Sequence, residues 1–89
     1  MKRSHVVVPW SHGLHLRPAA ALVKAARRFR SAVLLRSGDK VADLRNILSI
    51  IALCATLGTP LAIEATGDDE QEAADAVERV FTSEQGAGT

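Results

Sequence analysis

The sequence predicts a small α+β sandwich, in which helices cover one face of a small, mostly antiparallel sheet. Its 89 residues are 47% hydrophobic, which is enough apolar side chains for one modest core and no second one. Segments typical of strands and of helices follow one another in the order βαββαβα, and no internal repeat or linker interrupts them. We therefore expect a single domain over residues 1–89, with a flexible tail at 83–89.

The chain is predicted to begin with a strand, a loop and a helix. Residues 4–8 (SHVVV) are rich in β-branched types and stop at Pro9, as a strand does. Residues 11–13 (SHG) have the composition of a loop. From Pro18 to Phe29 apolar residues recur at helical spacing, with Lys and Arg on the other side. This pattern predicts a surface helix with a basic outer face.

A hairpin, a short helix, a strand and a last helix are predicted to follow. Residues 32–36 are expected to form a strand that turns at 37–39 (SGD) and returns at 40–42. A short apolar helix is expected within 45–53 (RNILSIIAL), followed by a strand at 60–66 that ends at Gly67. From about Asp69 to Phe81 the apolar spacing is again helical, and acidic residues lie near the start, where the helix dipole favours negative charge.

Charge is unevenly divided along the chain, although the formal net charge is only +1. Residues 1–45 carry ten of the eleven Lys and Arg, whereas residues 46–89 carry eight of the ten Asp and Glu. A basic face built from the first half would attract an acidic protein, a phosphate-bearing group or nucleic acid. We expect no nucleic-acid partner, because Trp10, Phe29 and Phe81 are the only aromatic residues and do not alternate with basic ones.

No segment predicts export or insertion into a membrane. The chain has no unbroken apolar stretch of about 18 residues, and we expect neither a membrane span nor a signal peptide. Its single cysteine, Cys54, has apolar neighbours and is expected to be a small buried hydrophobe in a reducing compartment. The sequence therefore predicts a cytoplasmic protein, which we expect to be a monomer.

The stretch 13–20 (GLHLRPAA) is the most informative one for function. Pro18 suits the first turn of a helix, which places His15 and Arg17 at the helix N-terminus. Free backbone N–H groups and the positive end of the dipole favour an anion there, and the Arg17 guanidinium matches phosphate oxygens. His15 adds a nucleophilic nitrogen in surroundings that favour a neutral ring. These features predict a phosphoryl group carried on His15.

Two plainer interpretations compete with this one. A lone histidine before a helix is most often an exposed or capping residue. The three histidines, His5, His12 and His15, also raise the question of a metal site. No acidic or cysteine ligand accompanies them in this segment, so we expect neither a metal nor a cofactor.

The segment 45–53 predicts a surface for a partner. A short helix that is apolar all the way round cannot bury every side against so small a core. Leu57 and the last helix could cover the whole segment. If instead only Ile50 and Leu53 face the core, the other large apolar residues form an exposed patch of the kind that partners bind: Ile47, Leu48 and Ile51.

GLHLRPAA resembles the active-site signature of the HPr family, the histidine-containing phosphocarriers of the bacterial phosphotransferase system, whose usual form is Gly-Leu-His-(Ala/Thr)-Arg-Pro-Ala. The resemblance extends over roughly residues 4–82, because the element order, the interrupted second helix and the last helix also fit the family. It implies the HPr-like form of the predicted sandwich, an open-faced β-sandwich with three helices on one face of a four-stranded antiparallel sheet. It also implies a phosphoryl carrier whose chemistry is completed by partner enzymes, not an enzyme in its own right.

By this resemblance, His15 is phosphorylated on Nδ1 by enzyme I at the expense of phosphoenolpyruvate and passes the phosphoryl group to a IIA protein or domain. Arg17 binds the phosphoryl oxygens and assists transfer, and the backbone N–H groups around Leu16 and Arg17 face the phosphate. The docking face shared by the partners is implied to contain Ala20, Lys24, Arg27, Ile47, Leu48 and Ile51.

The chain departs from the family pattern at several positions. Asn46 occupies the place of a regulatory serine in Gram-positive members, so that control is not expected, and its role is not transferred to Ser49. Leu16 replaces a small or hydroxyl residue and His12 a small polar one such as Asn, which implies different hydrogen bonding around His15.

The pathway and two further functions stay open. The segments AVLLR and IEATG are similar to the nitrogen-related branch, which implies regulation of nitrogen or potassium metabolism in place of sugar uptake. One rival function is a regulatory module that docks on its target irrespective of phosphorylation. The other is a small anion-binding or metal-binding protein with no transfer role.

Overall fold

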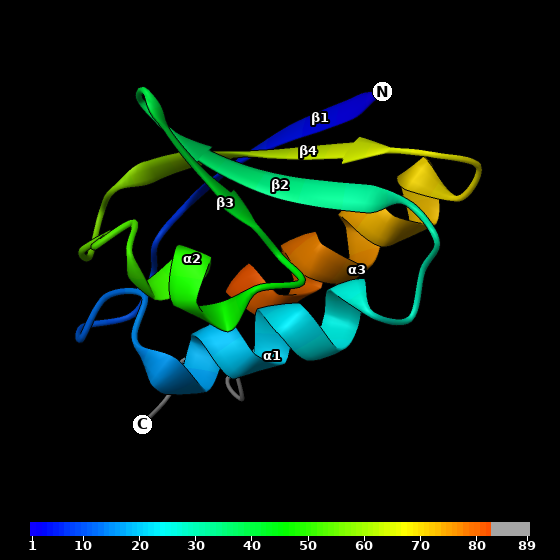
Figure 1. Ribbon diagram of the computed structural model, residues 1–89. Helices are drawn as coiled ribbons and strands as arrows, with labels where there is room; N and C mark the ends of the chain where they lie inside the picture. Colours follow the sequence, from blue (N-terminus) through cyan, green and yellow to red (C-terminus); the bar gives the residue numbers. More distant parts are fainter. Residues whose placement is uncertain (83–89) are drawn as a thin grey trace.

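The computed structural model describes residues 1–82, and the tail expected at 83–89 lies outside the described residues. The elements follow the predicted order βαββαβα (Figure 1). Helix α1 begins two residues before Pro18 and ends before Phe29. The seven elements are β1 (Lys2–Val7), α1 (Leu16–Ala26), β2 (Ala32–Ser37), β3 (Lys40–Asp43), α2 (Ile47–Ile51), β4 (Pro60–Thr66) and α3 (Glu70–Thr82).

The four strands form one sheet in the order β1-β4-β2-β3, and every neighbouring pair is antiparallel. Ile63 in the middle of β4 pairs with Ser4 of β1 and with Leu35 of β2. All three helices lie on one face of the sheet, and the other face is open (Figure 1). The predicted α+β open-faced sandwich is confirmed.

The core lies between the sheet and the helices. Leu61, Ile63 and Ala65 alternate along β4 and are buried, because successive side chains of a strand point to opposite faces. No helix among residues 1–82 is long and apolar enough to cross a membrane. Helices α1 and α3 pack against each other, and each buries two or more alanines in the core: Ala19, Ala26, Ala73, Ala74 and Ala76.

Cys54 is exposed, so the expectation of a buried cysteine is wrong. The residue follows α2 and has a φ of 53°, the left-handed conformation that commonly ends a helix. Its N–H group still donates to the carbonyl oxygen of Ile51 at 3.1 Å. The left-handed turn directs the Cys54 side chain to solvent, whereas Leu53 and Ala55 on either side are buried.

The open face of the sheet holds a carboxylate between two arginines. Glu64 alternates with the core residues of β4, yet it is only 6% exposed. Arg3 Nη2 donates to its Oε2 at 2.7 Å, and Arg36 donates from Nε and Nη2 to the two carboxylate oxygens at 3.1 and 3.3 Å. The hydrogen bonds from Arg36, followed by the charges of both arginines, hold the pKa of Glu64 below its usual value, although burial opposes them.

We expect acid to remove the contribution of Glu64 to stability. A carboxyl whose pKa is lowered by folding stabilises the folded chain fully above its unfolded pKa of about 4.3, and this stabilisation is lost as the pH falls through the folded pKa. Glu64→Gln cannot titrate and leaves two arginines without a carboxylate, so it should be less stable than the wild type at about pH 7.

Melting temperatures measured from about pH 7 to about pH 3 check this expectation, and the difference between the two proteins should shrink toward the acid end. Hydrogen bonds from the Ser31 hydroxyl and from the N-terminal amine also lower the pKa values of Asp69 and Glu70. Both residues are present in both proteins, so their titration cancels in the difference. A constant difference over the whole pH range would mean that the charge of Glu64 contributes nothing.

Candidate functional site

The loop between β1 and α1 is fixed by backbone contacts with the loop after α2. Gly58 N–H donates to the carbonyl oxygen of Val8 at 2.8 Å, and Leu14 N–H donates to that of Ala55 at 2.9 Å. Gly13 has a φ of +71°, and a Cβ atom at this position would lie 2.6 Å from the Ala55 oxygen. Only glycine can adopt this left-handed φ and also approach the Ala55 backbone so closely without strain. The two residues before His15 are therefore held in one place.

His15 is the N-cap of α1, in an extended conformation with φ −93° and ψ −169°. Its carbonyl oxygen accepts the first helical hydrogen bond, from Ala19 at 3.0 Å, but its side chain makes no capping hydrogen bond. Leu16 and Arg17 are the first two helical residues, and the third, Pro18, has no N–H group. The predicted position of His15 and Arg17 at a helix N-terminus is confirmed.

The two nitrogens of the His15 ring differ in their surroundings. Nε2 is buried and has no hydrogen-bond partner among the described residues, so a reactant would have to approach the other nitrogen, Nδ1. The ring of His12 lies edge-on to that of His15, with 5.8 Å between ring centroids and an interplanar angle of 87°. A purely structural histidine would use its buried nitrogen in a hydrogen bond. This ring is positioned without such a bond.

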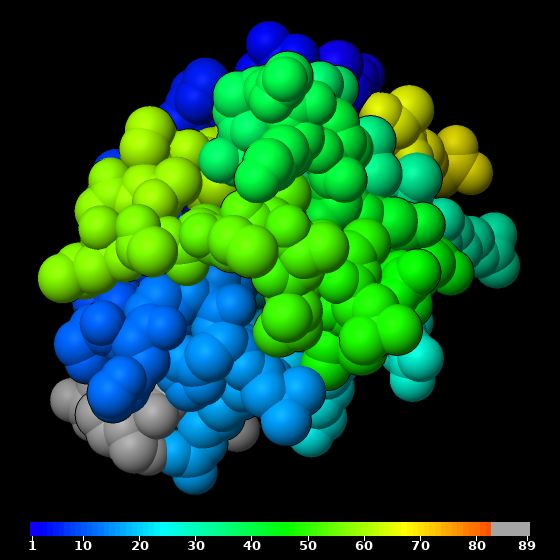
Figure 2. Space-filling model, turned by 60° about the vertical axis from the view of Figure 1, so that its left-hand side comes forward, coloured from blue at the N-terminus to red at the C-terminus, as the bar shows by residue number. Residues whose placement is uncertain are grey.

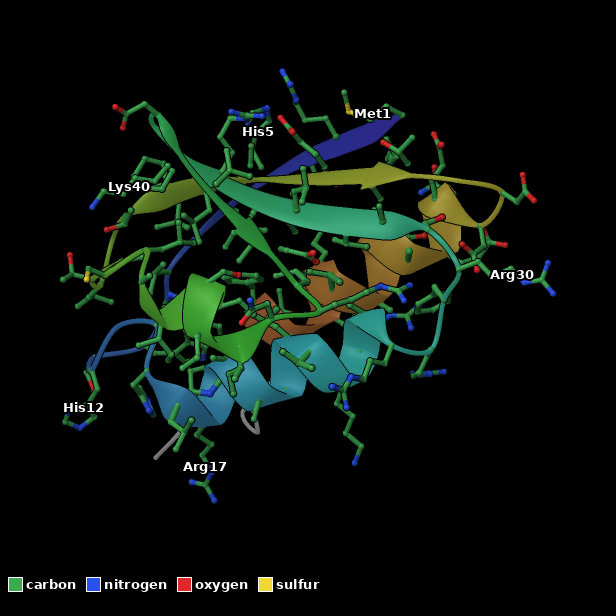
Figure 3. All side chains as sticks on the ribbon, viewed as in Figure 1. Met1, His5, His12, Arg17, Arg30 and Lys40 are labelled. Carbon is green, nitrogen blue, oxygen red and sulfur yellow. The ribbon has the colours of Figure 1, made fainter. Side chains whose placement is uncertain are left out.

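Leu16 and Arg17 are exposed on either side of the helix start. The Leu16 side chain is 66% exposed, although leucine is apolar. Figure 3 shows Arg17 extending outward from the beginning of α1. The helix end beside His15 is therefore accessible, with an apolar and a cationic side chain next to it.

A groove of about 700 Å³ lies between α1 and α2. Figure 2 shows the face on which the start of α1 and the preceding loop lie beside residues 45–58. Sequence reasoning missed Val23, Arg45 and Asn46, which also line the groove. Arg45 and Asn46 directly precede the apolar residues of α2, so their place in the sequence could have indicated that they line the groove. Ile51 does not line the groove, but the other five residues implied for docking do: Ala20, Lys24, Arg27, Ile47 and Leu48.

The apolar patch on α2 is smaller than predicted. Ile50 and Leu53 are buried, as expected. Leu48 is 74% exposed, but Ile47 and Ile51 are half-buried and pack against the core. Leu48 is therefore the exposed part of the patch, and the two isoleucines serve the core as well as the surface.

Asn46 and Ser49 both stabilise the start of α2. The Asn46 side chain accepts hydrogen bonds from the N–H groups of Leu48 and Ser49, at 3.0 and 3.4 Å. The Ser49 hydroxyl lies between the carbonyl oxygens of Asp43 and Asn46, at 2.9 and 2.8 Å, and accepts from the Asp43 N–H group. Ser49 is thus tied to the start of α2.

The basic residues of the first half do not form one face. Three of them, Lys24, Arg27 and Arg45, line the groove, whereas Arg3 and Arg36 bond to the carboxylate of the open sheet face. Among residues 1–82, no three His, Cys, Asp or Glu side chains are grouped in a way that could hold a metal ion. The site consists of the His15 helix end and a groove that combines apolar and basic side chains.

Comparisons with known proteins agree on one family. The family profile described as "PTS HPr component phosphorylation site" matches residues 2–83. The phosphocarrier protein HPr of Haemophilus influenzae is 46% identical over 63 residues, 71% of this chain and 74% of that protein. The HPr-like protein Crh of Bacillus subtilis is 38% identical over 73 residues, 82% of this chain and 86% of Crh. The crystal structure of HPr-C-His from Thermoanaerobacter tengcongensis matches with a TM-score of 0.90 at 31% identity, covering 100% of this chain and 98% of the other. The chain therefore belongs to the HPr family of the phosphotransferase system.

Proposed function

We propose that the chain accepts a phosphoryl group on Nδ1 of His15 from enzyme I, which draws it from phosphoenolpyruvate. The chain then passes the group to a IIA protein or domain of a sugar or nitrogen-type phosphotransferase system. The observation that carries this proposal is the setting of the His15 ring at the N-terminus of α1, with Nε2 buried and without a partner. Membership of the HPr family supports the same role.

The transfer exchanges one bond to phosphorus for another. The lone pair of Nδ1 forms a bond to phosphorus while the bond between phosphorus and the donor atom breaks, and the donor keeps that electron pair. The proton of the neutral ring stays on Nε2. The transferred group brings negative charge to the end of α1, where N–H groups and the positive end of the dipole stabilise it. Onward transfer to IIA repeats the exchange, with Nδ1 as the leaving atom.

Incubation with enzyme I and radiolabelled phosphoenolpyruvate tests the proposal. We expect the chain to acquire a label that acid removes and alkali does not, as is characteristic of a phosphorus–nitrogen bond. The HPr of Haemophilus influenzae, labelled in parallel, shows that the enzyme I is active. An unlabelled chain beside a labelled control would contradict the proposal.

Arg17→Ala is expected to slow transfer without unfolding the chain. The side chain is exposed, so the melting temperature should hardly change. Loss of charge-assisted hydrogen bonds to the phosphoryl oxygens should lower the rate about tenfold to a hundredfold. Rapid-quench measurement of label transfer from enzyme I checks this, with Arg17→Lys as the variant that keeps the charge but loses the planar fork. An unchanged rate for Arg17→Ala would remove Arg17 from the mechanism.

Leu48→Glu and Ile47→Glu should separate docking from folding. Leu48 is 74% exposed in a groove with basic side chains, so a glutamate there should weaken binding to enzyme I and leave the melting temperature nearly unchanged. Ile47 packs against the core, so Ile47→Glu should also lower the melting temperature. Calorimetric titration with enzyme I, together with thermal melts, measures both effects. Unweakened binding of Leu48→Glu would place the docking face elsewhere.

A second candidate function is a regulatory module that acts by docking alone. The groove favours it, because its lining residues do not include His15. The relative Crh is described as a catabolite repression HPr. Retained binding of a partner by a chain that takes no label would support this candidate over the carrier.

A further inference from the structure

His12 has no part in the function proposed above, although its ring is beside the proposed phosphoryl acceptor. The two rings are 5.8 Å apart between centroids and nearly perpendicular. His12 is exposed, so it can rotate and exchange a proton with solvent. Its loop is fixed by the contacts of Gly13 and Leu14 with Ala55, so the distance between the two histidines is set by the fold.

The burial of Nε2 determines where a phosphoryl group on His15 would lie. With Nε2 buried, the group would be attached to Nδ1, on a ring whose neighbour at 5.8 Å between centroids is the exposed His12. A phosphoryl group carries between one and two negative charges near neutral pH. The negative charge of this group favours the protonated form of an imidazole a few ångströms away.

We propose that His12 takes up a proton from solvent when His15 is phosphorylated and then donates a hydrogen bond to a phosphoryl oxygen. This inference rests on the proposed function of His15. His12 forms and breaks no covalent bond; it acts as a partner of the phosphoryl group. Because the coupling is reciprocal, a protonated His12 in turn stabilises the phosphorylated chain. The phosphorylated form is therefore favoured more at about pH 6 than at about pH 9.

Few other titratable groups face this loop within the described residues. On α1 the charged side chain at the start of the helix is Arg17. The loop after α2 contributes Cys54. Helix α3 reaches the loop through Phe81, which stacks on Trp10, and the basic residue in its last turn is Arg79. None of these side chains is a histidine or a carboxylate.

Competition for a limiting phosphoryl group tests the proposal. The wild type and a tagged His12→Gln variant are mixed with catalytic enzyme I and a small amount of labelled phosphoenolpyruvate, and the label is allowed to equilibrate. We expect the wild type to hold at least about fivefold more label than His12→Gln at about pH 6, and an equal amount at about pH 9. His12→Lys, whose charge is fixed, should keep the advantage at both pH values.

His5→Gln is the matched control. His5 lies on the sheet side of the molecule, whereas His12 lies on the loop at the lower left (Figure 3). This variant should share the label equally with the wild type at every pH. As a second measurement, NMR of the full chain phosphorylated with phosphoramidate should show His12 becoming protonated at higher pH than in the unphosphorylated chain.

Two results would overturn the inference, and they can be told apart. If His15 is labelled but the label is shared equally between the wild type and His12→Gln at about pH 6, His12 has no role while the carrier function stands. If neither enzyme I nor phosphoramidate labels His15, both proposals fail together.

Discussion

His15→Ala is expected to abolish phosphoryl acceptance while leaving the fold intact. The ring makes no capping hydrogen bond, and its buried Nε2 has no partner, so its removal breaks no hydrogen bond within the described residues. The free energy of unfolding should change by no more than about 1 kcal/mol. The rate of labelling by enzyme I should fall below detection, because the ring that caps α1 and accepts the phosphoryl group is absent.

Labelling with radioactive phosphoenolpyruvate measures phosphoryl acceptance. Thermal melts of the same preparation measure the stability of the fold. His5→Ala, on the sheet side of the molecule, should be labelled as fast as the wild type. A full label on folded His15→Ala would show that the phosphoryl group is carried elsewhere. Loss of folding would mean instead that His15 is mainly a structural residue.

Gly13→Ala is expected to be the most damaging small substitution in the loop before α1. The added Cβ would lie 2.6 Å from the Ala55 oxygen and 3.1 Å from Thr56 Cα, and both are backbone atoms that cannot easily move away. The left-handed conformation, with φ +71°, adds about 1–2 kcal/mol for a residue that has a side chain. Together these effects should lower the free energy of unfolding by about 3 kcal/mol or more. Denaturant unfolding measures the loss.

Gly58→Ala provides the matched control, because Gly58 also has a left-handed φ, of +86°, but a Cβ there would meet nothing within 4 Å. It should therefore cost only the conformational part, about 1–2 kcal/mol. Equal losses for the two variants would mean that the approach of Gly13 to Ala55 contributes nothing. A larger loss for Gly13→Ala should be accompanied by slower labelling of His15, because the loop that precedes His15 is displaced.

The order of the elements could be predicted because the signals for it are local. Pro9 and Gly67 mark the ends of segments, and the spacing of apolar residues distinguishes strands from helices within about ten residues. Pro18 fixes the start of a helix for a similar reason, since its ring sets φ and removes one N–H group. The positions of His15 and Arg17 at the helix end followed directly from it.

The features that could not be predicted depend on residues far apart in the sequence or on a single backbone torsion. Arg3 and Glu64 are 61 residues apart and meet only through the pairing of β1 with β4, so nothing local indicates that they neutralise one another. The exposure of Cys54 follows from one left-handed φ after α2. The contact between the rings of His12 and His15 likewise needs the turn at Gly13, which spacing alone does not describe.

The carboxylate on the open sheet face has a consequence for the way partners approach. The carboxylate offsets one of the two positive charges of Arg3 and Arg36, whereas the groove between α1 and α2 is lined by Lys24, Arg27 and Arg45 and, among the described residues, by no acidic side chain. An acidic protein diffusing nearby is therefore attracted to the groove and turned toward it before contact. Such electrostatic steering raises the association rate constant far more than it slows dissociation, and salt weakens it.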